Sequence, residues 1–185
     1  MPLLILDRDG VINQESDNFI RRVEDWIPIP GSIEAIAELS RAGYRIAIAT
    51  NQSGIGRGYF TLNELEAMHQ KLFQQVEILG GQIAGIFYCP HLPQEGCSCR
   101  KPATGLLDAI REELGESPEG AIFIGDSLRD LQAGRAAGCR PILVKTGKGA
   151  DTFQVLQGQH PAITDPQDIP VYADLASAAR AILAS

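Results

Sequence analysis

The stretch LLILDRDG, residues 3–10, places four consecutive apolar residues directly before two aspartates and a glycine. A short, continuous apolar run is typical of a strand that is covered on both faces of a parallel sheet. Asp7 and Asp9 should therefore emerge at the carboxyl end of this strand, which is the edge where such sheets bind ligands. Gly10 would let the chain turn away at that point.

Similar apolar runs alternate with helical patterns along the rest of the chain. Strands are predicted over 45–49, 83–88, 121–124 and 141–144, and helices over 32–41, 62–79, 105–114, 128–137 and 175–183. Thr61 and Glu64 form a capping box that opens the second of these helices. Strands that alternate with helices indicate βα units and a parallel sheet. The predicted fold is a doubly wound α/β sandwich of three layers, formed by residues 1–185 as a single domain.

Three segments interrupt this rhythm. Segments 8–30 and 89–104 are long connections, and long ordered loops in compact domains are often functional. Segment 146–170 is predicted to be irregular, with a short additional strand near 162–164. Its Thr146-Gly147-Lys148 lacks the flanking residues of a Walker loop and is interpreted as a turn. His69, on the predicted helix 62–79, is expected at the surface.

Charge and composition narrow the function. The formal net charge is −7, and no Lys/Arg cluster exceeds a dipeptide, which argues against a nucleic-acid partner. No apolar run approaches the roughly 20 residues that cross a bilayer, and the N-terminus has no basic leader. We therefore expect a cytoplasmic protein without a membrane partner. A small phosphate ester remains compatible with the acidic charge, because a metal ion and a few local cations invert the field within one cleft.

Further polar groups follow other strands. Thr50, Asn51, Gln52 and Ser53 end the second strand, and Gly125, Asp126 and Ser127 follow the fourth, with Asp130 one helical turn later. Lys101 lies in the loop before the fourth strand. Taken alone, Asp7 and Asp9 are also compatible with two solvated aspartates in a turn. Neighbouring carboxylates repel each other unless a cation lies between them, and oxygen ligands suit Mg²⁺. Together these groups predict a phosphoryl-transfer site.

A second metal site is predicted in the loop 89–99. Its four ligands are Cys89, His91, Cys97 and Cys99. Four soft or borderline ligands match a closed, tetrahedral Zn²⁺ site, which leaves no open position for catalysis. The expected task of this zinc is to order the loop that presents Arg100 and Lys101. Cys139 stands apart and is expected to be a core residue.

The motifs DRDGV (7–11), Thr50, Lys101 and GDSLRD (125–130) resemble those of the haloacid dehalogenase superfamily. The resemblance implies that Asp7 attacks phosphorus and becomes an aspartyl phosphate. Asp9 would protonate the leaving alcohol and later activate water, while Thr50 and Lys101 stabilise the charge of the phosphoryl group. Mg²⁺ would be held by the side chains of Asp7 and Asp126 and by the backbone carbonyl of Asp9.

Within the superfamily, the stretches DRDGVIN (7–13), TNQSGIGRG (50–58) and CPH…CSCRKP (89–102) resemble those of the heptose bisphosphate phosphatases. Those enzymes lack a large cap domain and carry a loop zinc. The resemblance implies a small phosphorylated sugar as substrate: removal of the 7-phosphate of D-glycero-D-manno-heptose 1,7-bisphosphate for ADP-heptose and lipopolysaccharide core, by a monomeric enzyme. The substrate contacts it implies are Glu15, Ser16, Asp17, Asn18, Asn51, Gln52, Ser53 and Arg100.

Other activities remain as alternatives. Histidinol-phosphate phosphatases share DRDG, TNQ, the zinc loop and RKP, and the five-residue spacer between His91 and Cys97 is equally typical of them. SGIGRG (53–58) and GLL (105–107) favour the heptose substrate. Ser127 stands where some heptose phosphatases have a lysine, which leaves the anomeric preference open. A catalytically inactive binding module is disfavoured because the four motifs retain their functional residues, and a polynucleotide 3′-phosphatase because no basic groove is indicated.

Overall fold

The computed structural model describes residues 1–158, 163 and 165–185, which contain one six-stranded parallel sheet. The strands are β1 (Leu3–Leu6), β2 (Arg45–Asn51), β3 (Gly85–Cys89), β4 (Ile122–Gly125), β5 (Arg140–Val144) and β6 (Val171–Tyr172). They lie in the order β3-β2-β1-β4-β5-β6. The chain thus winds outward from β1 in one direction and returns to β4 to wind in the other. The predicted doubly wound α/β fold is confirmed, and its switch point lies between β1 and β4.

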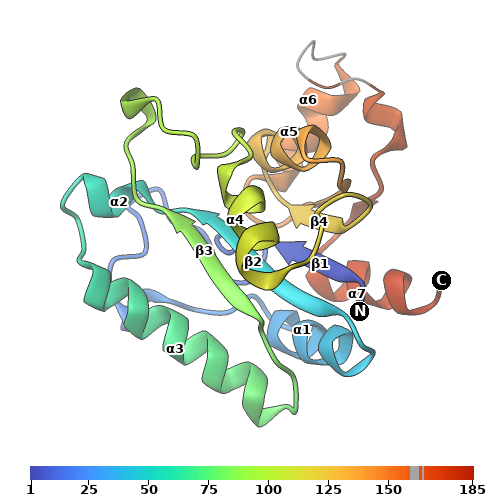
Figure 1. Ribbon diagram of the computed structural model, residues 1–185, viewed down its shortest axis with the longest axis horizontal. Helices are drawn as coiled ribbons and strands as arrows, with labels where there is room; N and C mark the ends of the chain where they lie inside the picture. Colours follow the sequence, from blue (N-terminus) through green and yellow to red (C-terminus); the bar gives the residue numbers. More distant parts are fainter. Residues whose placement is uncertain (159–162, 164) are drawn as a thin grey trace.

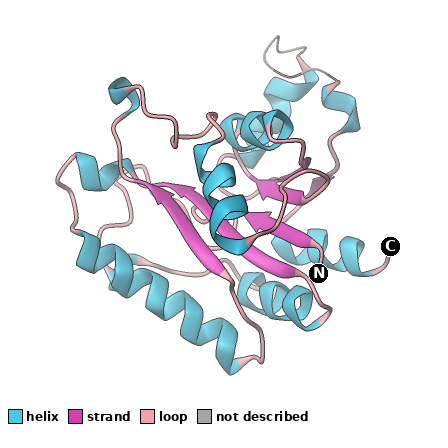
Figure 2. Ribbon diagram, viewed as in Figure 1, coloured by secondary structure: helices cyan, strands magenta, loops and turns pink. Residues whose placement is uncertain are grey.

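Helices cover both faces of the sheet (Figures 1 and 2). The helices α1 (Ser32–Arg41), α3 (Leu62–Ile78) and α7 (Leu175–Leu183) pack on one face, and α4 (Gly105–Leu114) and α5 (Leu128–Ala136) on the other. Because side chains alternate along a strand, Leu4 and Leu6 join the first core and Leu3 and Ile5 the second. Both faces of β1 are therefore buried, as its continuous apolar run predicts.

The prediction that 146–170 is irregular is wrong. It contains the helix α6 (Gly149–Gln157) and the 3₁₀ turn η3 (Pro166–Asp168), and β6 follows. Phe153 and Leu156 of α6 pack in a small cluster with Leu131 and Leu143. The large apolar residues of this nine-residue helix, Phe153, Val155 and Leu156, span about one turn, which is too short to establish a helical period. Tertiary packing holds the helix. The predicted strand near 162–164 includes residues outside the described part of the chain.

The remaining short elements are α2 (Ser53–Gly56), η1 (Val23–Asp25) and η2 (Pro93–Glu95). The capping box of Thr61 and Glu64 at the start of α3 is confirmed. β2 runs two residues further than predicted, so Thr50 and Asn51 belong to the strand itself. Cys139 is buried as predicted, whereas His69, predicted at the surface, is only 8% exposed.

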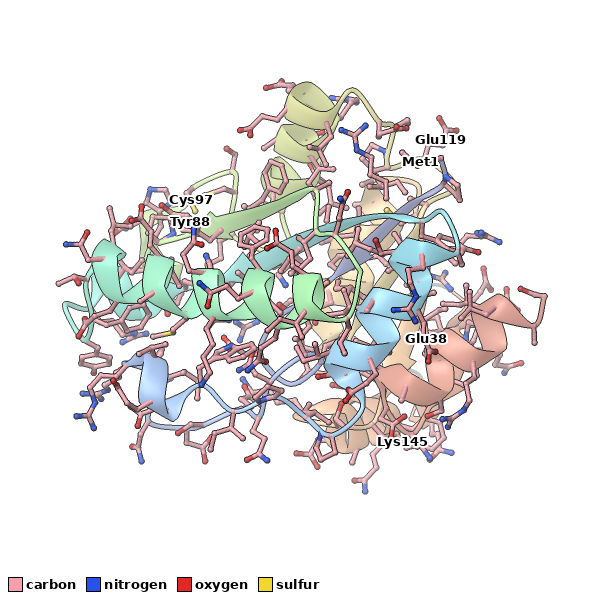
Figure 3. All side chains as sticks on the ribbon, turned by 90° about the horizontal axis from the view of Figure 1, so that it is seen from below. Met1, Glu38, Tyr88, Cys97, Glu119 and Lys145 are labelled. Carbon is pink, nitrogen blue, oxygen red and sulfur yellow. The ribbon has the colours of Figure 1, made fainter. Side chains whose placement is uncertain are left out.

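In Figure 3 the two ends of the strands can be told apart by labelled residues. Cys97 lies near Tyr88 of β3 at one end, and Met1 lies near Glu119 at the other. The carboxyl ends of the strands thus point toward the cysteine loop, as the sequence predicts for the site. Within the described residues, we find no helix that is both long and apolar enough to span a bilayer.

Candidate active site

Three carboxylates meet at the carboxyl ends of β1 and β4. Asp7, Asp126 and Asp130 each offer an oxygen within 4.8 Å of the others, and all three side chains are buried. The backbone N–H of Asp7 donates to Ile124 O at 3.0 Å and joins the two strands at this point. Burial, with the charge of Asp130, raises the pKa of Asp7 to about 7. Burial, with the charges of Asp7 and Asp130, raises the pKa of Asp126 to about 9.

Lys101 supplies a positive charge to this cluster. Its ammonium group donates to Asp7 Oδ1 at 2.9 Å, to Asp130 Oδ1 at 2.6 Å and to Ala49 O at 2.8 Å. Burial lowers the pKa of Lys101, but Asp130 and Asp7 outweigh burial and raise it. One ammonium cannot balance three buried carboxylates. Buried oxygen ligands with excess negative charge suit a Mg²⁺ ion, which would also favour the ionised form of both aspartates.

Asp130 is already engaged on both oxygens. Oδ1 accepts from Lys101, and Oδ2 accepts from the Ser127 hydroxyl at 2.8 Å, the Ser127 N–H at 3.0 Å and the Asp126 N–H at 3.2 Å. Ser127 in turn caps α5 through the N–H of Asp130. Asp130, one helical turn after Asp126, is by its position in the sequence a further candidate cation ligand. These contacts instead make it an anchor for Lys101, which leaves Asp7 and Asp126 to hold the ion.

The loop before α6 encloses Asp126, a contribution that the sequence analysis missed. The N–H of Lys148 donates to Asp126 Oδ2 at 2.8 Å, and the Thr146 hydroxyl donates to Gly10 O at 2.6 Å. Gly10 and Gly147 both have positive φ, and a Cβ on either would lie 2.0 or 2.2 Å from Asp126 Oδ2. The only sequence signal was Gly147, which was interpreted as an ordinary turn glycine.

Asp9 has surroundings unlike those of Asp7. Its Oδ1 accepts from Arg8 Nη2 and from Asn13 Nδ2, both at 2.8 Å, and its Oδ2 accepts from Gln52 Nε2 at 2.9 Å. Burial alone would raise the pKa of Asp9, but Arg8 and these hydrogen bonds outweigh it and hold the pKa below its usual value. The pKa values of the two aspartates thus move in opposite directions, so the two carboxyl groups lie in unlike electrostatic environments.

The end of β2 arranges the predicted Thr50 and its neighbours around this pair. Thr50 is buried, and its hydroxyl accepts from Gln52 Nε2 at 2.9 Å. Asn51 exchanges two hydrogen bonds with the backbone of Lys101, at 3.0 and 3.1 Å. Ser53 is buried at the first position of α2. Asn51 therefore positions Lys101 whatever else it contacts.

The predicted substrate residues near the start of the chain include Glu15, which contacts the loop before α6. Glu15 pairs with Lys148 Nζ at 2.9 Å and, with Gln14, Asp17 and Gly147, lines a hollow of about 290 Å³. Ser16, Asp17 and Asn18 are exposed.

Arg100 directly precedes Lys101 in the chain. Its Nη1 is buried without a hydrogen-bond partner among the described residues. Burial and the nearby charges of Arg129 and Arg57 lower the pKa of Arg100. An unpaired guanidinium nitrogen beside other cations is suited to binding an anion.

The cysteine loop gathers its four predicted ligands. Cys89 Sγ lies 3.0 Å from Cys99 Sγ and 3.6 Å from Cys97 Sγ, and His91 Nδ1 lies 3.1 Å from Cys99 Sγ and 3.4 Å from Cys89 Sγ. A tetrahedron with Zn–S bonds of about 2.3 Å has S–S edges of about 3.8 Å. The ligand types and their convergence fit zinc, although the sulfur pairs lie closer than that edge.

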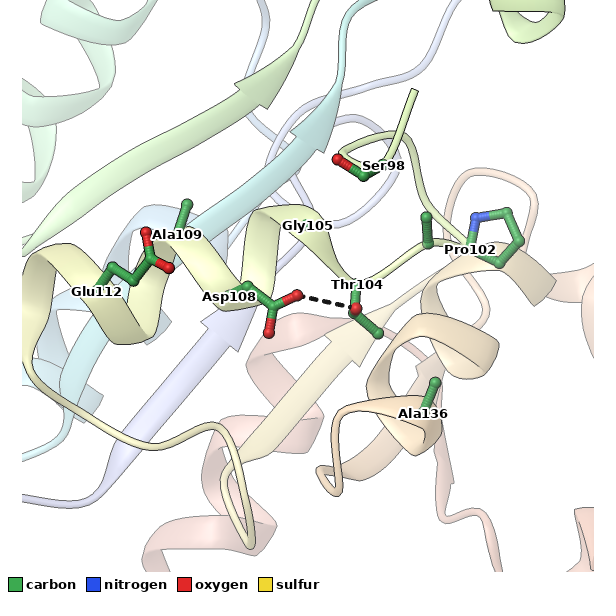
Figure 4. Close-up of a pocket in the computed structure, with 9 residues that line it drawn as sticks. Ser98, Pro102, Thr104, Gly105, Asp108, Ala109, Glu112 and Ala136 are labelled. Atoms are coloured by element: carbon green, nitrogen blue, oxygen red, sulfur yellow. Dashed lines mark hydrogen bonds between the residues drawn. The ribbon is translucent and has the colours of Figure 1, made fainter. Parts of the chain in front are cut away.

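Figure 4 shows another hollow, of about 530 Å³, beside the first turns of α4. Asp108 and Glu112 point along its wall, and the Thr104 hydroxyl donates to Asp108 Oδ2 at 3.0 Å. None of the strand-end carboxylates lines it. The larger hollow is thus separate from the groups described above, and we assign the chemistry to the smaller hollow because Gly147 joins it to Asp126.

Comparisons with known proteins agree with this geometry. The HAD-hydrolase-like family model matches residues 98–178. The D-glycero-beta-D-manno-heptose-1,7-bisphosphate 7-phosphatase of Pseudomonas putida is 52% identical over 183 residues, which are 99% of this chain and 100% of that protein.

Solved structures give the same result. The D,D-heptose 1,7-bisphosphate phosphatase of B. bronchiseptica, complexed with magnesium and phosphate, matches with a TM-score of 0.91 and 44% identity, covering 100% of this chain and 99% of that one. The enzyme of Burkholderia thailandensis matches with a TM-score of 0.74 and 39% identity, covering 100% of both chains. The chain therefore belongs to the haloacid dehalogenase-like hydrolases, in the family of the heptose bisphosphate phosphatases.

Proposed function

We propose that this phosphatase removes the 7-phosphate of D-glycero-beta-D-manno-heptose 1,7-bisphosphate and that Asp7 is its nucleophile. The observation that carries the proposal is the pair Asp7 and Asp9 at the switch point of the sheet, one beside Lys101 and Asp126, the other held by Arg8. The anomer is that named for the relatives. We also propose that it acts in the cytoplasm, within ADP-heptose synthesis for lipopolysaccharide.

In the first step, a carboxylate oxygen of Asp7 forms a bond to phosphorus while the bond from phosphorus to the sugar oxygen breaks. The electron pair of the broken bond stays on the sugar oxygen, which takes a proton from Asp9. The phosphate dianion that binds beside Asp9 favours the protonated acid needed for this transfer. Lys101 and the hydroxyl of Thr50 stabilise the charge on the phosphoryl oxygens.

In the second step, Asp9 takes a proton from water as that water attacks the aspartyl phosphate. The new bond to phosphorus forms while the bond to Asp7 breaks, which restores the carboxylate of Asp7 and the protonated acid of Asp9. Splitting the reaction through a covalent intermediate replaces one difficult step by two easier ones. Mg²⁺ held by Asp7 and Asp126 would supply the remaining positive charge at the phosphoryl group.

Two groups of residues support the sugar bisphosphate as substrate. Arg100 offers the second phosphate a planar guanidinium whose Nη1 has no hydrogen-bond partner in the described part of the chain, in the field of Arg57 and Arg129. Glu15, Ser16, Asp17 and Asn18 on one side, and Asn51, Gln52 and Ser53 on the other, would then contact the sugar. We also propose that zinc bound by Cys89, His91, Cys97 and Cys99 orders the loop that carries Arg100.

The substrate is tested by measuring phosphate release with Mg²⁺ from both anomers of the heptose bisphosphate and from histidinol phosphate. We expect kcat/KM to be highest for the beta anomer. A higher kcat/KM for histidinol phosphate would reject the heptose substrate while leaving the mechanism intact. If the heptose substrate is confirmed, Arg100→Ala should raise KM for the bisphosphate, because it removes the contact with the second phosphate. KM for a heptose 7-monophosphate should stay nearly unchanged.

The nucleophile is tested with Asp7→Asn. This variant should fold, because the amide is close in shape to the carboxyl, and should lose turnover by more than about 1,000-fold, because no aspartyl phosphate can form. Circular dichroism checks the fold and phosphate release checks the activity. Substantial turnover in folded Asp7→Asn would exclude Asp7 as the nucleophile.

Zinc is tested by elemental analysis, which should find about one zinc per chain. A strong chelator should then reduce activity even with excess Mg²⁺, and added zinc should restore it. A Cys139→Ser variant is the control: it should still carry about one zinc per chain, because this thiol lies outside the cluster. A purified, active protein with no zinc would contradict the assignment.

A further inference from the structure

The two oxygens of Asp9 are not equivalent. Oδ1 accepts three N–H groups: Arg8 Nη2 at 2.8 Å, Arg8 Nε at 3.1 Å and Asn13 Nδ2 at 2.8 Å. Oδ2 accepts one, from Gln52 Nε2 at 2.9 Å. An oxygen surrounded by three donors has no free lone pair for a proton. A proton on Asp9 therefore belongs on Oδ2.

The side chain that locks Oδ1 is itself held from α3. Arg8 is fully buried, and its remaining nitrogen, Nη1, lies 3.3 Å from His69 Nε2 and 3.8 Å from Met68 Sδ. A guanidinium has donors only, so the contacting nitrogen of His69 must be the acceptor. His69 is therefore neutral and carries its proton on Nδ1. Burial and the charge of Arg8 lower the pKa of His69 to about 3, in agreement with a neutral ring.

His69 is well placed for this contact. It lies in the middle of the 17-residue helix α3, is 8% exposed, and packs at a tilt against the Tyr88 ring of β3, with the ring centroids 6.2 Å apart. An arginine stem has several rotatable bonds, so a guanidinium held at Asp9 alone could turn about that contact. A second contact from a rigid helix fixes its plane.

We propose that His69 is a positioning residue for proton transfer by Asp9: through Arg8 it fixes Oδ1, so that Oδ2 alone gives and takes the proton. The inference rests on the proposed role of Asp9 as acid and base. It adds a residue on α3, 60 positions away in the chain from Asp9, to the machinery of the reaction.

The experiment compares leaving groups, because a sugar alkoxide needs a proton to leave whereas a nitrophenolate does not. Single-turnover release of the leaving group is measured with Mg²⁺ for the sugar phosphate and for p-nitrophenyl phosphate. His69→Phe keeps a ring but removes the acceptor. We expect it to slow release from the sugar phosphate by about 10- to 100-fold, to slow release from p-nitrophenyl phosphate by less than about 3-fold, and to leave KM nearly unchanged.

Matched variants separate this role from core packing. His69→Gln keeps an acceptor and should recover most of the rate. Met68→Leu removes the other contact of Nη1 and keeps the bulk of the core, so it should behave as wild type. His69→Leu is a second acceptor-free variant, and Arg8→Lys, which leaves His69 in place, should show the same selective loss. Thermal melting establishes that each variant is folded.

Equal losses on both substrates, or a wild-type rate in folded His69→Phe, would overturn the inference. Asp9→Asn distinguishes it from the proposed function, because it should show the same selective loss to a greater degree. If Asp9→Asn is selective and the His69 variants are not, only the role of His69 is rejected. If Asp9→Asn cleaves the sugar phosphate normally, the proposed role of Asp9 fails as well.

Discussion

Lys101 shows how single residues create this site. Its three N–H donors are all engaged by buried acceptors, which fixes the ammonium between Asp7 and Asp130. The backbone of Lys101 is clamped by Asn51 from β2. Although Lys101 lies in a loop, its position is thereby fixed as firmly as that of a residue in the sheet.

At the same scale, Gly147 is expected to be indispensable. Gly147→Ala adds a Cβ at 2.2 Å from Asp126 Oδ2 and 2.5 Å from Gly10 Cα, at a φ of +57°. Both neighbours belong to the site, so we expect a loss of at least about 10-fold in kcat/KM and a lower free energy of unfolding. Gly120→Ala is the control, because φ is +76° and, apart from its chain neighbours, no described residue has an atom within 4 Å of the added Cβ. Steady-state kinetics and urea unfolding of both variants check this; equal activity in the two would contradict it.

Three of the described helices, α3, α5 and α7, begin with a capping box, and two of them have a hydroxyl side chain at the cap. Ser127 at the start of α5 and Thr61 at the start of α3 each accept from the backbone N–H three residues on, in complete capping boxes. Only the box of α5 includes a residue that contacts Lys101, namely Asp130. The cap of α5 therefore affects both the stability of its helix and the position of Lys101, whereas the cap of α3 affects helix stability alone.

Ser127→Ala and Thr61→Ala should consequently differ. Each variant loses a cap, at a cost of about 1 kcal/mol in free energy of unfolding. Ser127→Ala also frees Asp130 Oδ2 from a hydrogen bond and should lower kcat, whereas Thr61→Ala should keep the wild-type kcat. Chemical unfolding and turnover measured on the same samples test the contrast. A wild-type kcat in Ser127→Ala would show that Asp130 holds Lys101 without its help.

For the whole molecule, the acidic cluster links stability to pH and to metal. Without Mg²⁺, the pKa of Asp7 is about 7 and that of Asp126 about 9, both above the ordinary value of 3.8. The folded state therefore binds these protons more tightly than the unfolded chain. Stability that is present at low pH is lost as pH rises through the two folded values.

We expect the Tm of Mg-free protein, with zinc supplied, to fall between pH 7 and 9. His69 does not oppose this trend, since its unfolded pKa of 6.5 lies below the window. Millimolar Mg²⁺ should raise Tm most at pH 9, because it binds the ionised carboxylates. Asp126→Asn should reduce both the fall and the effect of Mg²⁺. Scanning calorimetry tests this; a Tm that rises from pH 7 to 9 in the Mg-free wild type would contradict it.

The local pattern determined the elements that bury apolar faces. Four elements have the predicted bounds, namely β1, α1, α4 and α7. Their continuous or periodic apolar residues indicate directly which faces are buried. Asp7, Asp9, Thr50, Lys101 and Asp126 could be predicted because each lies at or near a strand end, where a parallel sheet collects polar groups. The convergence of Cys89, His91, Cys97 and Cys99 could be predicted because ligand type and spacing within one loop restrict the geometry.

Only the tertiary structure decided which groups touch these residues. α6 is short and lies in a stretch that was predicted to be irregular, yet this helix and the loop before it enclose Asp126. His69 was predicted at the surface, because an isolated polar residue on a helix gives no sign of its partner. That partner, Arg8, comes from a loop about 60 residues earlier and is buried against α3. The burial of apolar residues follows from local sequence patterns. Pairing between distant polar groups depends instead on how the elements pack, and this packing determines which groups hold Asp9.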